Sequence, residues 1–251
     1  MTAKSILAAG VALACCTVAV ACGSAGAPTA AKSGGSAKSG GSATCVAGQA
    51  GSSSNVNSPQ EPASGVATIS GACWAKIAPT PITLNVIRTP PSGTSGEFKT
   101  AWAGGNLYVW CHAHTGRTSL INTNTGSPWE DDTVEVYLGP NDVAGSYQQG
   151  DGQILVNSGG LTDSTFGGDH TNLPTTGARE LEAQTKDGYT TLLIMPFSNI
   201  GVTGKKGTKV GFTIGIDFPN SSASQRVGQS MWAGTSTNWN DDSAWGTATL
   251  S

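Results

Sequence analysis

Trp129 and the acidic residues after it form the part of this chain whose residue types and spacing best suit ligand chemistry. The tryptophan stands in the segment Pro128–Asp132, which ends in three consecutive acidic residues, and Glu135 follows shortly after. An indole face covers apolar C–H groups, and a carboxylate is a strong acceptor for hydroxyl groups. An exposed tryptophan beside carboxylates is therefore typical of a sugar-binding site. The alternative, that Trp129 closes the open end of a β-sandwich as a core residue, stays open.

The residues after this segment predict a strand that presents Glu135. Apolar and other side chains alternate in the order Thr133, Val134, Glu135, Val136, Tyr137 and Leu138. Successive side chains of a strand point to opposite faces, so the valines and the leucine are expected to face a core. We therefore expect Glu135 to lie unburied on the opposite face, toward solvent or a ligand.

The rest of the chain from residue 66 onward predicts an all-β fold. Short apolar alternations are separated by Gly, Pro, Asn and Asp, and no stretch keeps a helical period, which favours a single two-layer antiparallel β-sandwich. A turn is expected at Gly104–Gly105. The expected strands lie at 81–88, 98–102, 106–112, 133–138, 146–147, 152–157, 180–185, 189–195, 209–217, 231–233 and 247–250.

The N-terminal third predicts export and tethering. Lys4 and the apolar run after it, to about residue 21, are typical of a secretory signal. The residues around Cys22 resemble a bacterial lipobox, which implies lipidation of Cys22, although Cys15 or Cys16 offers a competing site and plain secretion stays open. A Gly, Ser and Ala composition predicts a flexible linker over 23–65. The expected organisation is a signal peptide at 1–22, this linker, and a folded domain at 66–251, either lipid-anchored outside the cell or secreted.

Three cysteines remain outside the signal region, and an exported chain permits one disulfide among them. Three pairings are possible, and we favour Cys45 with Cys73. Cys111 shares a strand face with Leu107 and Val109, so it is expected to be a buried free thiol. The three cysteines lack the close spacing of a zinc site.

The charge of the chain argues against one class of partner. The formal net charge is −3, and the pI is about 5.5. Without a basic patch, nucleic acid is not an expected partner. We expect a monomer whose contact with the membrane is through the lipid anchor.

Several motifs follow one another in a characteristic order along the folded part. They are Trp102 to Val109, Pro128 to Val136, Gly188 to Phe197, Gly211 to Asp217, Gln225 to Gly228 with Trp232, and Asn238–Trp239 before Trp245–Gly246. In this order the chain resembles the family 9 carbohydrate-binding modules, which are DOMON-like β-sandwiches. The resemblance covers about residues 69–250 and implies a jelly-roll-like sandwich without catalysis, with structural calcium in some members.

The same resemblance implies a set of ligand residues. In the family two tryptophans clamp a sugar ring, and Trp129 and Trp239 stand at those two motif positions. Glu135 matches the hydroxyl acceptor. Further polar positions around the slot are matched by Asn157, Arg226 and Asn238, although an ordinary surface ion pair stays open for Arg226 and a core position for Trp239.

Some positions depart from the family pattern. Leu155 stands where sugar-binding members can carry an arginine, and Leu192 replaces a glutamate. Ser70 and Thr115 replace aspartates, which weakens the expectation of calcium. Oxygen ligands for calcium would have to come from aspartates such as Asp131, Asp132, Asp142 and Asp151.

Three other functions compete with carbohydrate binding. Related sandwiches hold haem between methionine and histidine, for which the candidates are Met195, His112, His114 and His170. A glycosidase would need a second acidic cluster facing Glu130 to Glu135, and Asp241–Asp242 is better explained as a loop. A degenerate module that packs against a partner protein also stays open. We expect a non-catalytic domain that binds carbohydrate at the cell surface.

Overall fold

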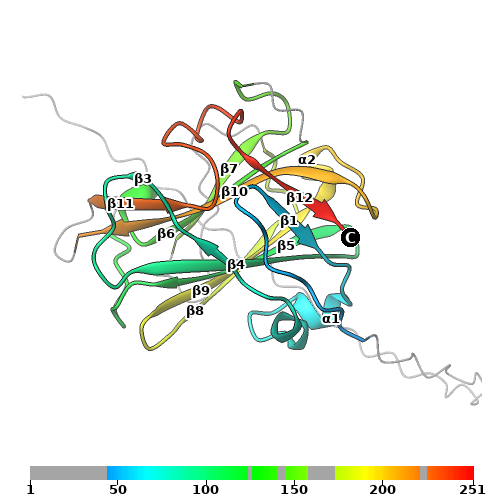
Figure 1. Ribbon diagram of the computed structural model, residues 1–251, viewed down its shortest axis with the longest axis horizontal. Helices are drawn as coiled ribbons and strands as arrows, with labels where there is room; N and C mark the ends of the chain where they lie inside the picture. The colour runs from blue at the N-terminus through cyan, green and yellow to red at the C-terminus, as the bar shows by residue number, and fades with distance from the viewer. Residues whose placement is uncertain (1–43, 124–125, 141–144, 158–172, 221–224) are drawn as a thin grey trace, which may run out of the picture. The chain divides into compact units, whose positions relative to one another are not determined.

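The structure of this protein is a computed structural model that describes residues 44–123, 126–140, 145–157, 173–220 and 225–251 (Figure 1). The expected signal peptide, its Cys22 and the expected linker as far as residue 43 lie outside the described residues. Within the described ranges, no helix is long and apolar enough to cross a membrane.

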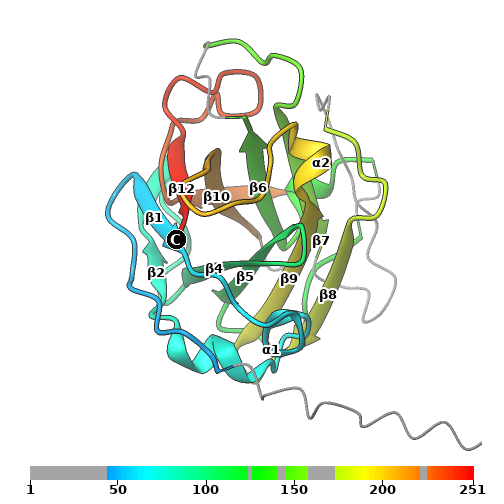
Figure 2. The same ribbon diagram turned by 90° about the vertical axis from the view of Figure 1, so that its right-hand side faces the viewer.

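Two β-sheets form two layers, as Figures 1 and 2 show. The first is a five-stranded antiparallel sheet with the spatial order β2-β4-β5-β9-β8. Its strands are β2 (Thr80–Ile82), β4 (Ser95–Ala103), β5 (Asn106–His114), β9 (Gly188–Pro196) and β8 (Arg179–Gln184). The Gly104–Gly105 turn between β4 and β5 is confirmed, and both glycines have the positive φ that favours glycine, 53° and 86°.

The second sheet has seven strands around the long strand β10 (Lys209–Pro219). One edge of β10 pairs with β6, and its other edge pairs first with β12 and then with β11. Beyond these lie β7, β1 and β3. The strands are β1 (Asn55–Ser58), β3 (Leu84–Ile87), β6 (Thr133–Gly139), β7 (Gly152–Asn157), β11 (Arg226–Met231) and β12 (Gly246–Leu250).

The predicted two-layer sandwich is confirmed, with one difference in strand direction. β1 runs parallel to β12, whereas the sequence predicted antiparallel pairing throughout. A parallel neighbour is possible here because β1 is short and its chain reaches β12 from a distant part of the sequence. In the described part of the chain, four short helices connect strands: α1 (Ala63–Val66), η1 (Ala72–Lys76), η2 (Pro128–Glu130) and α2 (Phe197–Ile200).

The main hydrophobic core lies between the two sheets. Val134, Val136 and Leu138 of β6 belong to it, as the alternation predicted, and they share it with the inward residues of β5. Phe98 packs edge-on against Trp232, with ring centroids 5.2 Å apart. Cys111 is a buried free thiol, as expected, and burial raises its pKa.

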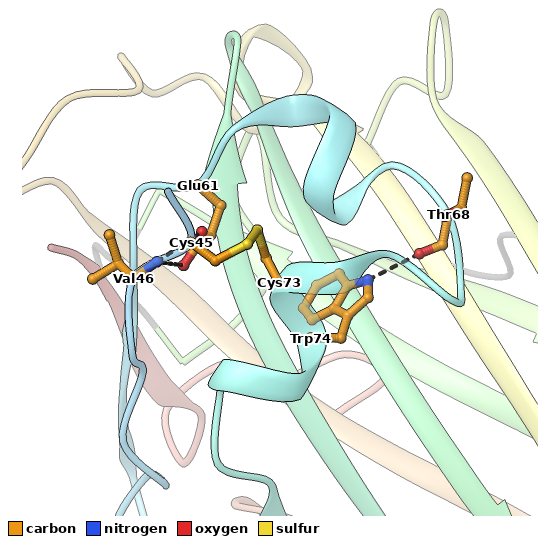
Figure 3. Close-up of a disulfide and its surroundings, with 6 residues drawn as sticks. All are labelled: Cys45, Val46, Glu61, Thr68, Cys73 and Trp74. Carbon is orange, nitrogen blue, oxygen red and sulfur yellow. Dashed lines mark hydrogen bonds between the residues drawn. A yellow bond between two sulfur atoms is a disulfide. The ribbon is translucent and has the colours of Figure 1, made fainter. Parts of the chain in front are cut away.

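The segment 44–65 corrects the expected linker boundary. The predicted disulfide between Cys45 and Cys73 is confirmed, and it joins this segment to η1 (Figure 3). Glu61 is only 4% exposed and accepts two contacts from the Val46 N–H, at 3.0 and 3.1 Å. Val56 of β1 enters the main core. The folded part therefore begins by residue 44, because a few apolar and bonded residues fix a segment whose composition is otherwise that of a linker.

Some strand boundaries also differ from the prediction. The expected strand 81–88 is two strands, β2 and β3, which belong to different sheets and are separated by Thr83. Of the expected strand 231–233, only Met231 is in a strand, as the last residue of β11, which begins at Arg226, and residues 232–233 form a bend. Residues 146–147 do not form a strand, and Ser146 lies in a bend. A change of sheet within one apolar run leaves the period-two pattern intact, so the alternation alone does not reveal it.

Candidate functional site

A cavity of about 220 Å³ opens on the face of the seven-stranded sheet that is turned away from the core. Its floor comes from strand residues that alternate with core residues, such as Glu135 between Val134 and Val136. Its walls come from η2 and from the loop between β11 and β12. The lining residues are Ile87, Trp129, Glu135, Tyr137, Gln153, Arg226, Gln229, Ser236 and Trp239.

Both predicted tryptophans line this cavity. Trp129 lies in η2, whose first position is Pro128, a residue with the backbone angle that a helical turn needs. It is half-buried, while Trp239, in the loop after β11, is 40% exposed. The structure thus brings together two indoles from distant parts of the sequence, and neither one lies in the sandwich core.

Glu135 lies at the cavity, but the expectation that it is unburied is wrong. Its side chain accepts hydrogen bonds from the Tyr137 hydroxyl and, at 2.7 Å, from Nε2 of Gln229. Nη1 of Arg226 lies 3.5 Å from its other oxygen. Glu135 is 1% exposed because the loop residues cover a sheet face that the alternation alone would leave to solvent. These donors hold a buried acceptor in a fixed orientation.

Arg226 connects Glu135 to a second buried carboxylate. Its Nη1 donates to Oδ1 of Asp217 at 3.0 Å, and its backbone N–H donates to Oε2 of Glu130 at 2.6 Å. Burial and the neighbouring Glu135 raise the pKa of Asp217, although Arg226 acts in the opposite direction. Arg226 is therefore an internal counter-ion for the cavity floor, and the open interpretation of it as a surface ion pair is wrong.

Asn238 is a correction to the expected site. It is 2% exposed, and its side chain is bonded within its own loop. Its Oδ1 accepts the Thr235 N–H at 2.9 Å, and its Nδ2 donates to the Ala233 carbonyl at 3.2 Å. A Cβ at Gly234 would lie 2.2 Å from this Oδ1, so the turn requires glycine there. Asn238 thus shapes the loop that carries Trp239 and does not line the cavity.

The other two notable positions lie on β7. Asn157 pairs with Thr133 in the strand register, and its side chain lies outside the described part of the structure. Leu155 pairs with Glu135 and is buried, and it does not line the cavity. An apolar side chain therefore stands beside Glu135 at the position where the resemblance implied an arginine.

The sequence interpretation missed five lining residues, which are Ile87, Tyr137, Gln153, Gln229 and Ser236. The alternation of side chains along a strand could have predicted two of them. Tyr137 shares a strand face with Glu135, and Gln153 of β7 pairs with Tyr137 of β6. Nε2 of Gln153 donates to the Tyr137 hydroxyl at 3.1 Å. The other three, Ile87, Gln229 and Ser236, reach the cavity only because the fold brings β3, β11 and the loop after β11 together.

Aromatic packing supports the walls of the cavity. The ring of Trp245 lies 5.7 Å from Tyr137 and 5.4 Å from Tyr147. The Tyr147 hydroxyl donates to the Asn238 carbonyl at 2.6 Å, and the Gly145 N–H donates to Asp242 at 2.6 Å. These contacts fix the loop of Trp239 against the segment before β7.

Two of the aspartates considered for calcium, Asp132 and Asp151, accept hydrogen bonds from protein groups. Asp132 binds Nη2 of Arg117 through both oxygens, at 2.6 and 2.7 Å, and also accepts the Ile121 N–H. Asp151 accepts the Gln148 N–H at 2.6 Å. Asp142 lies outside the described residues. The oxygens of Asp132 and Asp151 accept hydrogen bonds from protein groups that a calcium ion would have to replace. Calcium binding therefore stays a prediction that rests on the resemblance alone.

The haem alternative is not supported by the placement of its ligands. Met195 faces the core between the sheets, whereas His112 and His114 lie on the outer face of the same five-stranded sheet. A ligand group cannot bridge two faces of one sheet, so this methionine does not share a haem with either histidine. His170 lies outside the described residues.

A two-layer β-sandwich with a cavity of tryptophan, carboxylate and amide side chains on one sheet face has the form of a small-molecule binding module. Residues 67–251 match the family described as "Carbohydrate family 9 binding domain-like". The chain belongs to this family, which confirms the resemblance found in the motifs.

Curated relatives and solved structures agree with this assignment. The chain is 30% identical over 172 residues to an endo-1,4-beta-xylanase A of Thermoanaerobacterium saccharolyticum, covering 68% of this chain and 14% of that protein. It is 30% identical over 179 residues to the exoglucanase XynX of Acetivibrio thermocellus, covering 70% of this chain and 15% of that protein. The chain therefore spans a small part of each enzyme.

Two solved structures are similar in fold. Both are family 9 carbohydrate-binding modules of Caldicellulosiruptor kristjanssonii, one in complex with cellotriose and one with glucose. The TM-scores are 0.64 and 0.65, each at 20% identity and each covering 78% of this chain, with 93% and 95% of the respective module covered. At 20% sequence identity, this similarity shows a shared fold.

Proposed function

We propose that this protein binds carbohydrate without chemically changing it, and that a sugar ring lies between Trp129 and Trp239. The observation that carries the proposal is a single cavity lined by these two indoles and by the buried, hydrogen-bonded Glu135. Indole faces cover the C–H face of a pyranose, and a carboxylate accepts hydrogen bonds from its hydroxyls. Membership of the family supports the same function.

The polar floor suits hydroxyl recognition. A carboxylate offers about four acceptor positions, and Glu135 uses its oxygens for Tyr137, Gln229 and the longer contact to Arg226. Acceptor capacity is therefore left for a ligand hydroxyl. The amides of Gln153 and Gln229 each add a donor and an acceptor at the cavity floor.

The size of the cavity favours a short ligand segment. Its volume of about 220 Å³ is below the roughly 300–1,000 Å³ of sites for drug-sized ligands. One sugar unit, with the rest of a chain extending into solvent, suits this space. Affinity from one such unit is expected to be modest, about −4 to −8 kcal/mol.

The proposed ligand class is β-1,4-linked glucan or xylan. The similar modules were solved with cellotriose and glucose, and the matched relatives are named as a xylanase and an exoglucanase. We further propose a monomeric, extracellular domain that is anchored through a lipid on Cys22 or secreted. Mass spectrometry of the exported chain tests the anchor, because an unmodified N-terminus beyond Cys22 would contradict it.

Calorimetric titration of the full chain with glucose, cellotriose and xylotriose tests the function. We expect saturable binding with a dissociation constant between about 1 μM and 1 mM for at least one of them. The released products are analysed by chromatography, and an unchanged oligosaccharide supports the non-catalytic assignment. Absence of binding to all three sugars, with the chain folded, would contradict the proposed ligand class.

A further inference from the structure

A cluster of metal-binding side chains lies on the outer face of the five-stranded sheet. His112 and His114 stand at alternate positions of β5 and point to the same face, with ring centroids 4.2 Å apart. Asp187, in the turn between β8 and β9, lies beside them, and its Oδ2 is 3.0 Å from Nδ1 of His114. One ligand atom from each of the three residues lies within 4.8 Å of the others.

We propose that His112, His114 and Asp187 bind a divalent transition metal ion, for which Zn²⁺ is the probe. Two imidazoles and one carboxylate form a ligand set that Zn²⁺ and other divalent transition metal ions accept. Water can fill the remaining coordination positions of the ion. The hard ions Ca²⁺ and Mg²⁺ prefer all-oxygen sites, so this set discriminates against them.

The spacing requires the side chains to move closer together. In a tetrahedral site, two ligand atoms that each lie about 2.1 Å from the ion are about 3.4 Å apart. Separations of up to 4.8 Å therefore have to close by up to about 1.4 Å (4.8 − 3.4), through rotation of the half-buried side chains.

Neighbouring groups hold His112 and Asp187 in place. The Thr185 hydroxyl donates to Oδ1 of Asp187 at 3.0 Å, and Thr190 contacts Nδ1 of His112 at 2.9 Å. The Asp187 carbonyl accepts the N–H groups of Thr115 and Gly116, at 2.9 and 3.0 Å, which fixes the turn against the end of β5. Such supporting contacts orient ligands in known metal sites.

This cluster lies away from the proposed sugar site. Glu135 faces outward from the seven-stranded sheet, whereas the histidines face outward from the other sheet, so the main core separates them. The small cluster of Trp74, Tyr108 and their neighbours covers another part of the histidine face. His112, His114 and Asp187 are each half-buried, which leaves a route for an ion from solvent.

Calorimetric titration of the metal-free full chain with ZnCl₂ tests the proposal, with CaCl₂ as the ion that should not compete. We expect one Zn²⁺ per chain and a loss of affinity of at least about tenfold for Asp187→Asn, with a larger loss for the double variant His112→Gln/His114→Gln. Glu97→Gln is the matched control, because it removes a negative charge from the residue paired with His112 and should leave affinity within about twofold. The visible spectrum of the Co²⁺ form should show histidine coordination that disappears in the double variant.

Two results would overturn the proposal. One is the absence of Zn²⁺ binding to the folded parent chain. The other is binding of equal affinity by the double variant, which would assign the ion to another place, such as the remaining histidine, His170. Circular dichroism of each variant shows that the fold is retained, and glucose binding should be the same with and without Zn²⁺.

Discussion

Glu135 shows how a residue can be assigned correctly to a site and wrongly to an environment. The alternation along β6 places it on the face away from the core, and the structure agrees. Its burial comes from β11 and the loop of Trp239, which lie far away in the sequence. A local pattern reports the direction of a side chain, but it cannot report what covers that side chain.

Replacement of Glu135 tests the proposed hydroxyl acceptor. Glu135→Gln keeps the side-chain shape but removes the negative charge, and charged acceptors form stronger hydrogen bonds than neutral ones. We expect sugar affinity to fall by about tenfold or more, because a hydrogen bond to a charged group contributes about 1.5–3 kcal/mol. Calorimetry with the best of the three sugars measures this change, and an unchanged dissociation constant would contradict the role.

Asn238 should behave differently from the residues that line the cavity. Asn238→Ala removes the bonds to Thr235 and Ala233, so the loop should lose order. We expect a loss of about 1–3 kcal/mol in the free energy of unfolding, because buried partners are left unsatisfied. Urea unfolding measures this loss. If stability is retained while sugar affinity falls, the side chain contacts the ligand and its structural role is wrong.

At the scale of elements, strands were easier to predict than their partners. β4, β5, β6, β7, β9 and β12 lie close to their predicted positions because each has a clear alternation or a bounding turn. β1 was missed, since Gly and Ser dominate the composition around Val56. The division of 80–87 between two sheets was also missed, because sheet membership is decided by tertiary pairing.

The edge strand β8 contains a carboxylate that should make stability depend on pH. Glu180 pairs with Leu193 of the core, and neither of its oxygens has a hydrogen-bond partner within the described structure. Burial, with a smaller contribution from Glu182, raises its pKa from 4.5 to about 8. Between these values the folded state keeps a proton that the unfolded state has lost, so stability falls as pH rises through this window.

Glu180→Gln removes this titration. At a pH of about 8.5 we expect the variant to be more stable than the parent by roughly 1–3 kcal/mol, since each unit of pKa shift corresponds to about 1.4 kcal/mol. At a pH near 4 the two should differ little, because Glu180 is then protonated in the folded state. Urea unfolding across this range measures the difference, and parallel pH profiles for parent and variant would contradict the assignment.

The N-terminal segment depends on its disulfide. Cys45→Ser/Cys73→Ser opens a bridge between residues 28 positions apart, and we expect a loss of about 3–4 kcal/mol. For a domain of this size that loss corresponds to a decrease of roughly 6–16 °C in Tm. Scanning calorimetry measures it, and the reduced parent should match the variant. A Tm unchanged by the substitutions would show that the segment is held by its other contacts.

At the scale of the whole molecule, the two sheets separate two kinds of chemistry. One outer face has the cavity of indoles and carboxylates, and the other has the His112, His114 and Asp187 cluster. The core between them is continuous, with Phe98, Phe212 and Trp232 in mutual contact. Each face should therefore tolerate substitutions without loss of function on the other, because their residues share no contacts.

The most direct test of the account compares two tryptophan truncations in one calorimetric experiment with glucose or cellotriose. Trp239→Ala removes a 40% exposed indole from the cavity wall, and it should weaken binding by about tenfold or more with little change in Tm. Trp110→Ala is the control, because this half-buried indole lies on the opposite outer face, against the Ile69 carbonyl. It should leave the dissociation constant unchanged. Equal sugar binding by the parent and by a folded Trp239→Ala variant would contradict the two-tryptophan site.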